Sequence, residues 1–161
     1  MTRRMMAHAL LASTLLIVAS GCAGRFESDV HVDTTYDFSR VQSFAFVPAR
    51  TDMAPPKHSE ILEAAIRKEL VSRGYKEVAE AEASVLISYE LGVHASARLS
   101  GDNSFALEQG GITVRVMDPA TRRTVWYGWS QKTLTSEDSP EVAIPEAVTA
   151  LFSERIQDAP S

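Results

Sequence analysis

The chain has a single thiol, at Cys22, and this residue offers the most specific chemistry in the sequence. A lone cysteine forms no disulfide within its own chain, so it either pairs between chains or serves another covalent role. His31 and Asp33 would share one face of a strand, where they could form half of a metal or acid–base site. Zinc needs about three or four converging ligands, and neither His58 nor His94 stands at a spacing that completes such a set. We therefore interpret His31 and Asp33 as the polar side of an edge strand.

Motifs of the common enzyme classes are missing from the sequence. It contains no Gly-x-Ser-x-Gly turn of a serine hydrolase. It also contains no P-loop and no dinucleotide-binding fingerprint, since the pair Gly110-Gly111 lacks the rest of either pattern. We predict a non-enzymatic protein with no catalytic residue, no metal site and no cofactor.

The residues that precede Cys22 predict export and lipid attachment. Arg3 and Arg4 supply a positive start. An apolar run of about eleven residues follows at 9–19, which is short of the ~20 that a transmembrane helix needs. The run ends in Ala19-Ser20-Gly21-Cys22, and small residues before a cysteine resemble the lipobox of bacterial lipoproteins.

In a lipobox the thiol receives a diacylglyceryl group, the leader is cut before the cysteine, and the new amine is acylated. We therefore predict a signal peptide over residues 1–21, cleavage between Gly21 and Cys22, and lipid attachment at Cys22. The alternative is an ordinary signal peptide with a chance cysteine near its end. Two or three acyl chains on Cys22 would hold the protein on a lipid bilayer, because a single chain binds only reversibly. Ala23 in place of an aspartate favours the outer membrane, so we expect an envelope protein that faces the periplasm.

The charge of the chain argues against a nucleic-acid partner. The 161 residues carry 16 basic and 21 acidic side chains, for a formal net charge of −5. Loss of Arg3 and Arg4 with the leader makes the mature protein more negative still, and such a surface repels nucleic acid. Residues 22–28 are predicted as a lipidated tether that reaches at most about 20 Å, which keeps the folded domain close to the membrane.

Hydrophobic periodicity predicts one domain over residues 29–157, followed by a frayed tail at 158–161. Apolar residues alternate with polar ones in strands and recur at helical spacing in helices. Strands are predicted at 29–36, 41–47, 83–93, 111–117 and 123–134, and helices at 59–73 and 145–157, the first capped by Ser59 and the second with an alternative start at 139–140.

This order of elements predicts an α+β fold. We expect a single two-layer domain of order β-β-α-β-β-β-α, with a mostly antiparallel sheet and two helices on one face. The crossover through the first helix favours one parallel pair of strands. Residues 95–109 show no periodicity, so we predict a long mobile loop there.

The run Trp126-Tyr127-Gly128-Trp129 gathers large aromatic side chains on one predicted strand. Consecutive strand residues point to opposite faces, so at least one of Trp126 and Tyr127 must meet a second layer, solvent or a partner. We predict that Trp126, Tyr127 and Trp129 contribute to a partner or ligand surface, because exposed aromatic side chains are strong anchors. The alternative is that helices cover one face and loops cover part of the other. Gly128 lacks a side chain and would let another ring or backbone approach.

Several segments, in order along the chain, resemble the family of domains of unknown function 4136 (DUF4136). These segments are Tyr36-Asp37-Phe38-Ser39, Ser43-Phe44-Ala45-Phe46-Val47-Pro48, Arg73-Gly74-Tyr75, Ala83-Ser84-Val85-Leu86-Ile87, Gly111-Ile112-Thr113-Val114, Met117-Asp118 and Val125-Trp126-Tyr127-Gly128. Their order and spacing carry the resemblance. The chain departs from the family at the end of the last helix, where Glu154-Arg155-Ile156-Gln157 replaces a Phe-Pro-like motif. The resemblance implies a compact α/β domain and a bacterial lipoprotein, and it implies no activity.

Taken together, these features predict an interaction or accessory module of the cell envelope. Its contact surface is expected near Trp126 or the 95–109 segment, and its partner is expected to be an envelope protein. The alternative is a small-molecule or lipid-binding carrier. A carrier requires a continuous apolar cavity of at least ~300 Å³ between sheet and helices.

Overall fold

The computed structural model describes residues 26–48, 55–100 and 103–153, with the backbone alone given for 95–100 and 103–107. The predicted leader at 1–21, with Gly21 and Cys22 at its cleavage site, lies outside the described residues. The same holds for the tether up to residue 25 and for the tail at 158–161. None of the described helices is long and apolar enough to cross a membrane.

Six strands form one sheet in the order β1-β6-β5-β4-β2-β3. They are β1 (Glu27–Val32), β2 (Ser43–Phe46), β3 (Lys76–Glu77), β4 (Val85–Ser100), β5 (Asn103–Met117) and β6 (Thr124–Thr133). Neighbours are antiparallel, except that β2 runs parallel to both β4 and β3. The predicted mostly antiparallel α+β sheet with a parallel crossover pair is confirmed, and the short strand β3 was not predicted. Strand β1 starts at Glu27, inside the segment predicted as tether, because Glu27 and Ser28 already pair with β6.

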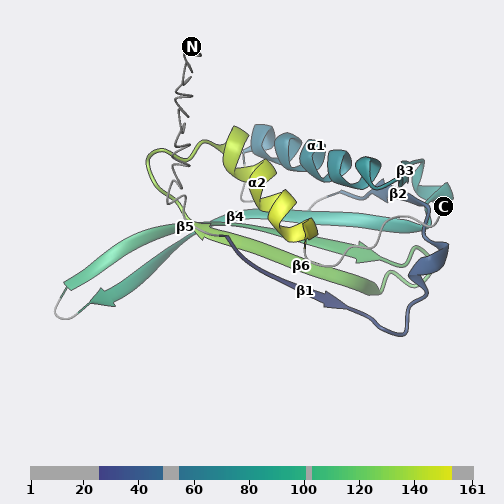
Figure 1. Cartoon of the computed structure of the whole chain (residues 1–161), viewed down its shortest axis with the longest axis horizontal. Coiled ribbons are helices and arrows are strands. Elements are labelled where there is room, and N and C mark those ends of the chain that lie inside the picture. The colour runs from purple at the N-terminus through teal and green to yellow at the C-terminus, as the bar shows by residue number, and fades with distance from the viewer. Residues whose placement is uncertain (1–25, 49–54, 101–102, 154–161) are drawn as a thin grey trace, which may run out of the picture.

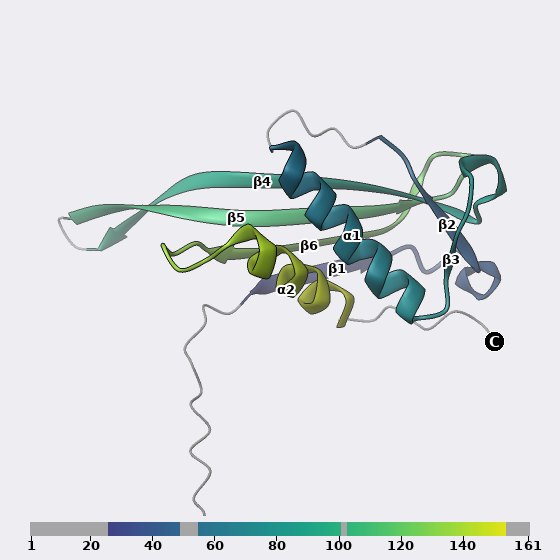
Figure 2. The same ribbon diagram turned by 90° about the horizontal axis from the view of Figure 1, so that it is seen from above.

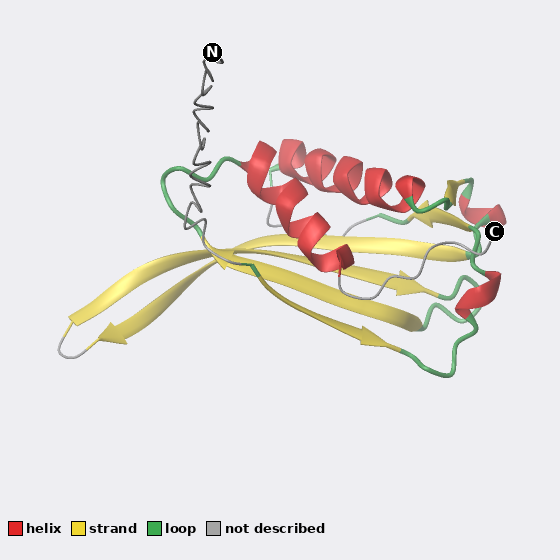
Figure 3. Ribbon diagram, in the orientation of Figure 1, coloured by secondary structure: helices red, strands yellow, loops and turns green. Residues whose placement is uncertain are grey.

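Two helices, α1 (Pro56–Ser72) and α2 (Pro140–Ser153), lie next to each other on one face of the sheet (Figures 1 and 2). Figure 3 shows that the opposite face carries none of the described helices. Two short 3-10 turns, η1 (Phe38–Arg40) and η2 (Glu80–Glu82), lie in the connections. The predicted two-layer arrangement is therefore confirmed, with the helices on one face, while the other face is buried only in part, around Ala45, Ala83 and Leu86.

Helix α1 begins earlier than its polar residues suggested. It starts at Pro56, and proline suits the first helical position because its φ is fixed there and its missing N–H costs no hydrogen bond. The prediction that Ser59 caps the helix is wrong, since Ser59 lies inside it and its Oγ is buried without a hydrogen-bond partner. Gly74 adopts φ 90° just after the helix, the left-handed conformation that ends helices, as predicted.

Helix α2 begins at Pro140, which is the alternative start rather than the predicted Pro145. The backbone carbonyl of Ser139 accepts hydrogen bonds from the N–H groups of Val142 and Ala143, at 3.1 and 2.9 Å. These bonds hold the first turn, so Pro145 remains inside the helix. Residues 154–157, the predicted end of this helix, lie outside the described residues.

The main core lies between the helices and the strands β4, β5 and β6. Alternate residues of these strands are buried on the helix side, and they meet the apolar stripes of both helices. The core includes Phe44, Leu62, Ile66, Val85, Ile87, Tyr89, Ile112, Val114, Trp126, Val148, Leu151 and Phe152. A smaller cluster of Ala45, Ala83 and Leu86 lies on the other face of β2 and β4.

Strands β4 and β5 continue past the rest of the sheet as a two-stranded hairpin that projects away from both helices (Figure 1). Their pairing runs from Leu86 opposite Met117 to Ser100 opposite Asn103. The prediction of a loop over residues 95–109 is therefore wrong. A strand alternates apolar and polar residues where one face packs on a core. The projecting part extends past the end of β6 at Thr133. Its sequence therefore lacks the alternation by which strands were predicted.

Candidate interaction surface and pocket

The aromatic run on β6 divides between the two faces of the sheet. Trp126 points to the helices, is 4% exposed and lies 5.8 Å from the ring of Phe152, measured between ring centroids. Tyr127 and Trp129 point to the opposite face and are partly exposed. Trp126 is therefore a core residue, and the structure removes it from the surface on which the sequence placed it.

Gly128 allows the tight packing of Trp126 under helix α2. A Cβ atom on Gly128 would lie 2.6 Å from Cη2 of Trp126 and 2.7 Å from Cδ1 of Leu151. Both distances are shorter than any side chain tolerates. The expected close approach at Gly128 is thus made by the indole ring of Trp126.

The open face around Tyr127 and Trp129 carries charged and aromatic side chains in alternating positions. We use the term open face for Asp29, His31, Glu90, Thr113, Arg115, Tyr127 and Trp129, which share one side of four adjacent strands. Tyr127 lies between His31 of β1 and Arg115 of β5, and Trp129 lies between Asp29 and Thr113.

Interactions within the open face fix the position of Tyr127. The guanidinium of Arg115 lies 5.7 Å from the centroid of the Tyr127 ring, and it donates to the carboxylate of Glu90 at 2.7 Å. A cation over an aromatic ring is attracted by the negative charge density of the ring face. On the open face, the ring of Tyr127 thus lies beside the positive charge of Arg115, which is itself paired with the negative charge of Glu90.

A shallow depression of about 480 Å³ lies beside Trp129. Gly92 and Gly111 are paired across β4 and β5 at this level, so the sheet surface between them carries no side chain. His94 bends over Gly92, with its Nε2 atom 3.2 Å from the place of a Cβ there. Gln131 forms another part of the rim.

The pair His31 and Asp33 lies on the edge strand β1 and in the turn after it. Asp33 Oδ1 accepts hydrogen bonds from the hydroxyl and the backbone N–H of Thr35, at 2.6 and 2.9 Å, and its Oδ2 accepts from Arg123 at 2.9 Å. These hydrogen bonds, those from Thr35 first, lower the pKa of Asp33. The carboxylate of Asp33 thus stabilises the turn through its hydrogen bonds with Thr35. Among the described residues, no three His, Cys, Asp or Glu side chains are grouped as metal ligands.

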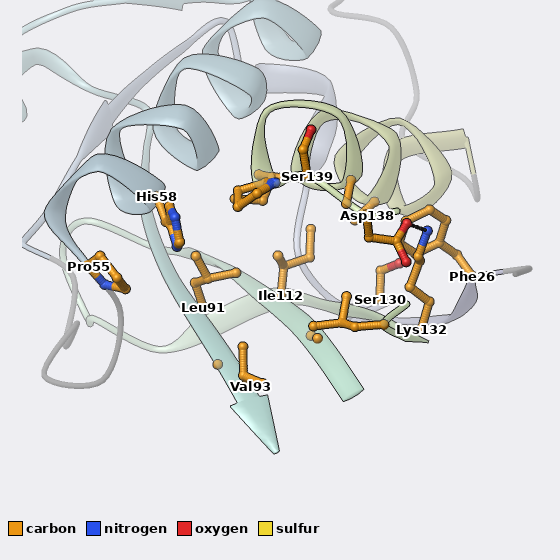
Figure 4. A pocket seen from close by; sticks show the side chains of 18 residues that line it. Phe26, Pro55, His58, Leu91, Val93, Ile112, Ser130, Lys132, Asp138 and Ser139 are labelled. Carbon is orange, nitrogen blue, oxygen red and sulfur yellow. Dashed lines mark hydrogen bonds and ion pairs between the residues drawn. The ribbon is translucent and has the colours of Figure 1, made fainter. Parts of the chain in front are cut away.

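A pocket of about 250 Å³ lies between the helices and the sheet, near the N-terminal ends of both helices (Figure 4). Leu91 and Ile112 project into it from β4 and β5, and Phe26, at the start of the described chain, lines one end. His58 stands at the opposite end, beside the start of α1. The pocket is in the place that the carrier interpretation requires, but its volume is below the ~300 Å³ expected for a carrier.

An ion pair that the sequence analysis missed closes the Phe26 end of this pocket. Lys132 is only 6% exposed, and its Nζ lies 2.5 Å from Oδ1 of Asp138 and 5.1 Å from the ring centroid of Phe26. The hydrogen bond from Lys132, together with those from Thr135, lowers the pKa of Asp138. The sequence could have indicated that Lys132 is buried, because the period of two places it on the same face of β6 as Trp126.

Comparison with known proteins identifies the family. Residues 28–154 match the family described as "Domain of unknown function (DUF4136)". No curated protein matches the chain in sequence. Among solved structures, a DUF4136 family protein from Bacteroides thetaiotaomicron is similar with a TM-score of 0.59 at 12% identity, over 80% of this chain and 95% of that one. The PelC dodecamer from Paraburkholderia phytofirmans is similar with a TM-score of 0.58 at 12% identity, over 80% of this chain and 96% of that one. The match over most of its length shows that this chain belongs to the DUF4136 family.

Proposed function

We propose that this protein is a lipoprotein anchored through Cys22 to the periplasmic side of the outer membrane, where it acts as a non-enzymatic interaction module. The observation that carries the proposal is the open face, on which Tyr127 and Trp129 stay partly exposed while the helices cover the other side of the sheet. An uncovered face of an antiparallel sheet is ordinarily polar. Aromatic side chains on such a face are typical anchors of protein contacts.

The charges around these two aromatic residues support a protein partner. Arg115 is held by Glu90 and lies over Tyr127, while Asp29 and His31 flank the aromatic residues on β1. Interfaces place large aromatic groups at the centre and charged groups at the rim. PelC is a dodecamer, so one protein of similar fold assembles from its own copies, and a second copy of this chain is among the partners to be tested.

Photo-crosslinking in intact cells tests the contact surface. A benzophenone amino acid is placed at Tyr127 or at Trp129, and at Val71 as the control, because Val71 is 53% exposed on α1. We expect a discrete product from the two open-face positions and none from Val71. A product at a multiple of the mass of this chain identifies a second copy, and any other discrete mass identifies a different protein. Equal labelling from all three positions contradicts the proposed surface.

Substitution of Cys22 tests the anchor. In the wild-type protein we expect mass spectrometry to find acyl groups on Cys22 as the first residue of the mature chain. Cys22→Ser removes the sulfur that receives the lipid, so this variant should leave the membrane fraction or keep its leader. Ser20→Ala keeps a small residue before the cysteine and should fractionate as the wild type does. An unmodified thiol in a secreted wild-type chain would rule out the anchor.

A carrier is the second candidate, and the pocket between sheet and helices is the observation in its favour. Pockets that enclose a drug-sized ligand usually measure ~300–1,000 Å³, and this one measures about 250 Å³. The size therefore favours the interaction module over a carrier of bulky ligands.

A further inference from the structure

The pocket between the helices and the sheet has the character of a site for a hydrocarbon chain. Leu91, Ile112 and Leu134 line it from the sheet side, and Ala143 and Ile144 line it from α2. Figure 4 shows the side chains of Leu91 and Ile112 pointing into the space beneath the helices. Its volume of about 250 Å³ is below that of pockets for drug-sized ligands, and it is sufficient for part of one unbranched chain.

The charged groups at the end of the pocket leave no net charge for an occupant to neutralise. Lys132 is paired with Asp138, whose second oxygen accepts from the N–H and hydroxyl of Thr135 at 2.8 and 3.0 Å. Ser130 is also satisfied, because Ser28 donates to its Oγ at 2.9 Å. A buried charge that is already paired neither needs nor favours a charged ligand. An uncharged apolar group therefore fits this site.

The beginning of the domain brings the lipid-bearing residue close to this pocket. Phe26 lines the pocket, and Cys22 stands four residues before it in the sequence. Four residues of fully extended chain span at most about 14 Å. An acyl chain carried by Cys22 thus starts within a short distance of the pocket, whatever path these residues take.

We propose that one acyl chain attached to Cys22 occupies this pocket, while the remaining acyl chains insert into the bilayer. The inference rests on the proposed lipidation of Cys22. Occupation removes from water the apolar lining that is still accessible, such as the partly exposed side chain of Leu91, which is favourable. The acyl chain is out of water both in the pocket and in the bilayer, so this gain comes from the pocket lining. It also ties the domain to its anchor at two points, so that the N-terminal ends of α1 and α2 stay near the membrane surface.

An acyl chain that carries a photoreactive group tests this occupant. Cells that make the full-length protein are fed a fatty acid with a diazirine on its chain, irradiated, and the protein is digested for mass spectrometry. We expect a crosslink within one chain, joining the acylated Cys22 peptide to the peptides that contain Leu91 or Ile112. Ala143→Phe fills the pocket and should abolish this crosslink, whereas Val142→Phe should retain it, since Val142 is 57% exposed on the outer side of α2.

The alternative outcomes separate this inference from the proposed function. Acylated Cys22 with crosslinks only to bilayer lipids overturns the pocket occupant and leaves the anchor intact. A phospholipid adduct on the Leu91 or Ile112 peptide, without the Cys22 link, also overturns it, because the chain then comes from the bilayer. Unmodified Cys22 overturns both proposals. Ala143→Leu fills less of the pocket and should reduce the crosslink, which guards against misfolding of the phenylalanine variant; a circular dichroism melt checks each variant.

Discussion

At the scale of single residues, the ion pair of buried Lys132 and partly exposed Asp138 closes the Phe26 end of the pocket. A lysine that is 6% exposed lies in a largely apolar wall, and it is compatible with that position because a carboxylate stands 2.5 Å from its Nζ. Removal of one partner would leave the other charge buried and uncompensated, which costs more than the pair contributes. The pair therefore holds the 135–138 turn against the end of β6.

The pH dependence of stability tests this pair through Asp138→Asn. The folded-state pKa of Asp138 is lowered, chiefly by the hydrogen bond from Lys132, so its stabilising effect is present above the unfolded pKa of about 3.9. That effect is lost as the pH falls through the folded pKa. We expect Asp138→Asn to lower the urea midpoint at pH 7 and to differ less from wild type at pH 3. Glu137→Gln removes the same charge at an exposed neighbour and should leave the midpoint unchanged. A difference for Asp138→Asn that is equal at both pH values would contradict this account.

At the scale of elements, strand β6 packs against α2 with one side and presents aromatic side chains on the other. Trp126 and Gly128 fit against α2, while Tyr127 and Trp129 face the other way. The missing side chain of Gly128 is what lets the indole ring and Leu151 approach the strand. Packing on one side thus positions the aromatic residues presented on the other.

Two glycine-to-alanine substitutions separate this packing from the general effect of glycine in a strand. Gly128→Ala places a Cβ within 2.7 Å of Leu151 and closer still to Trp126, so we expect a loss of about 1–3 kcal/mol in unfolding free energy. Gly111→Ala meets Cβ of Gln131 at 3.6 Å, an ordinary contact, and should be neutral or slightly stabilising. Urea denaturation followed by tryptophan fluorescence measures both. Equal effects of the two substitutions would show that the contact with Trp126 is unimportant.

At the scale of the whole molecule, the domain consists of a packed body and a projecting hairpin. The last pairing with β6 joins Gln109 to Thr133, and the N–H of Leu134 donates to the carbonyl of Glu108 at 2.7 Å. Beyond that point β4 and β5 pair only with each other among the described residues. A two-stranded hairpin without further support is marginally stable in water. The projecting part therefore adds little to the stability of the body.

Shortening the hairpin tests this division. Replacement of residues 96–107 by Asn-Gly joins Ala95 to Glu108, which already face each other, through a two-residue turn. We expect a change of less than about 1 kcal/mol in unfolding free energy, because the backbone of the replaced segment pairs with none of the other described strands. Circular dichroism melts and urea titrations measure it. A loss of several kcal/mol would instead show that the hairpin packs on the body of the domain.

The sequence predicted what depends on local periodicity and on chain connectivity. Alternation identified the strands around Val85, Ile112 and Val125, and helical spacing identified the buried stripe of Leu62 and Ile66. A helix between two strands implied the parallel pair of β2 and β4, because such a crossover returns the chain in the same direction. The signals for Cys22 are likewise local, and they determine the predicted anchor without reference to the fold.

Only the tertiary structure decided which of two equivalent faces is covered. A period of two separates Trp126 from Tyr127, but it cannot state which side receives α2, because that contact joins segments far apart in the chain. Long-range packing also buried Lys132 and brought Phe26 to the pocket, where its ring lies 5.1 Å from the ammonium of Lys132. Local sequence determines what each element can present, and packing against distant elements selects which side is used.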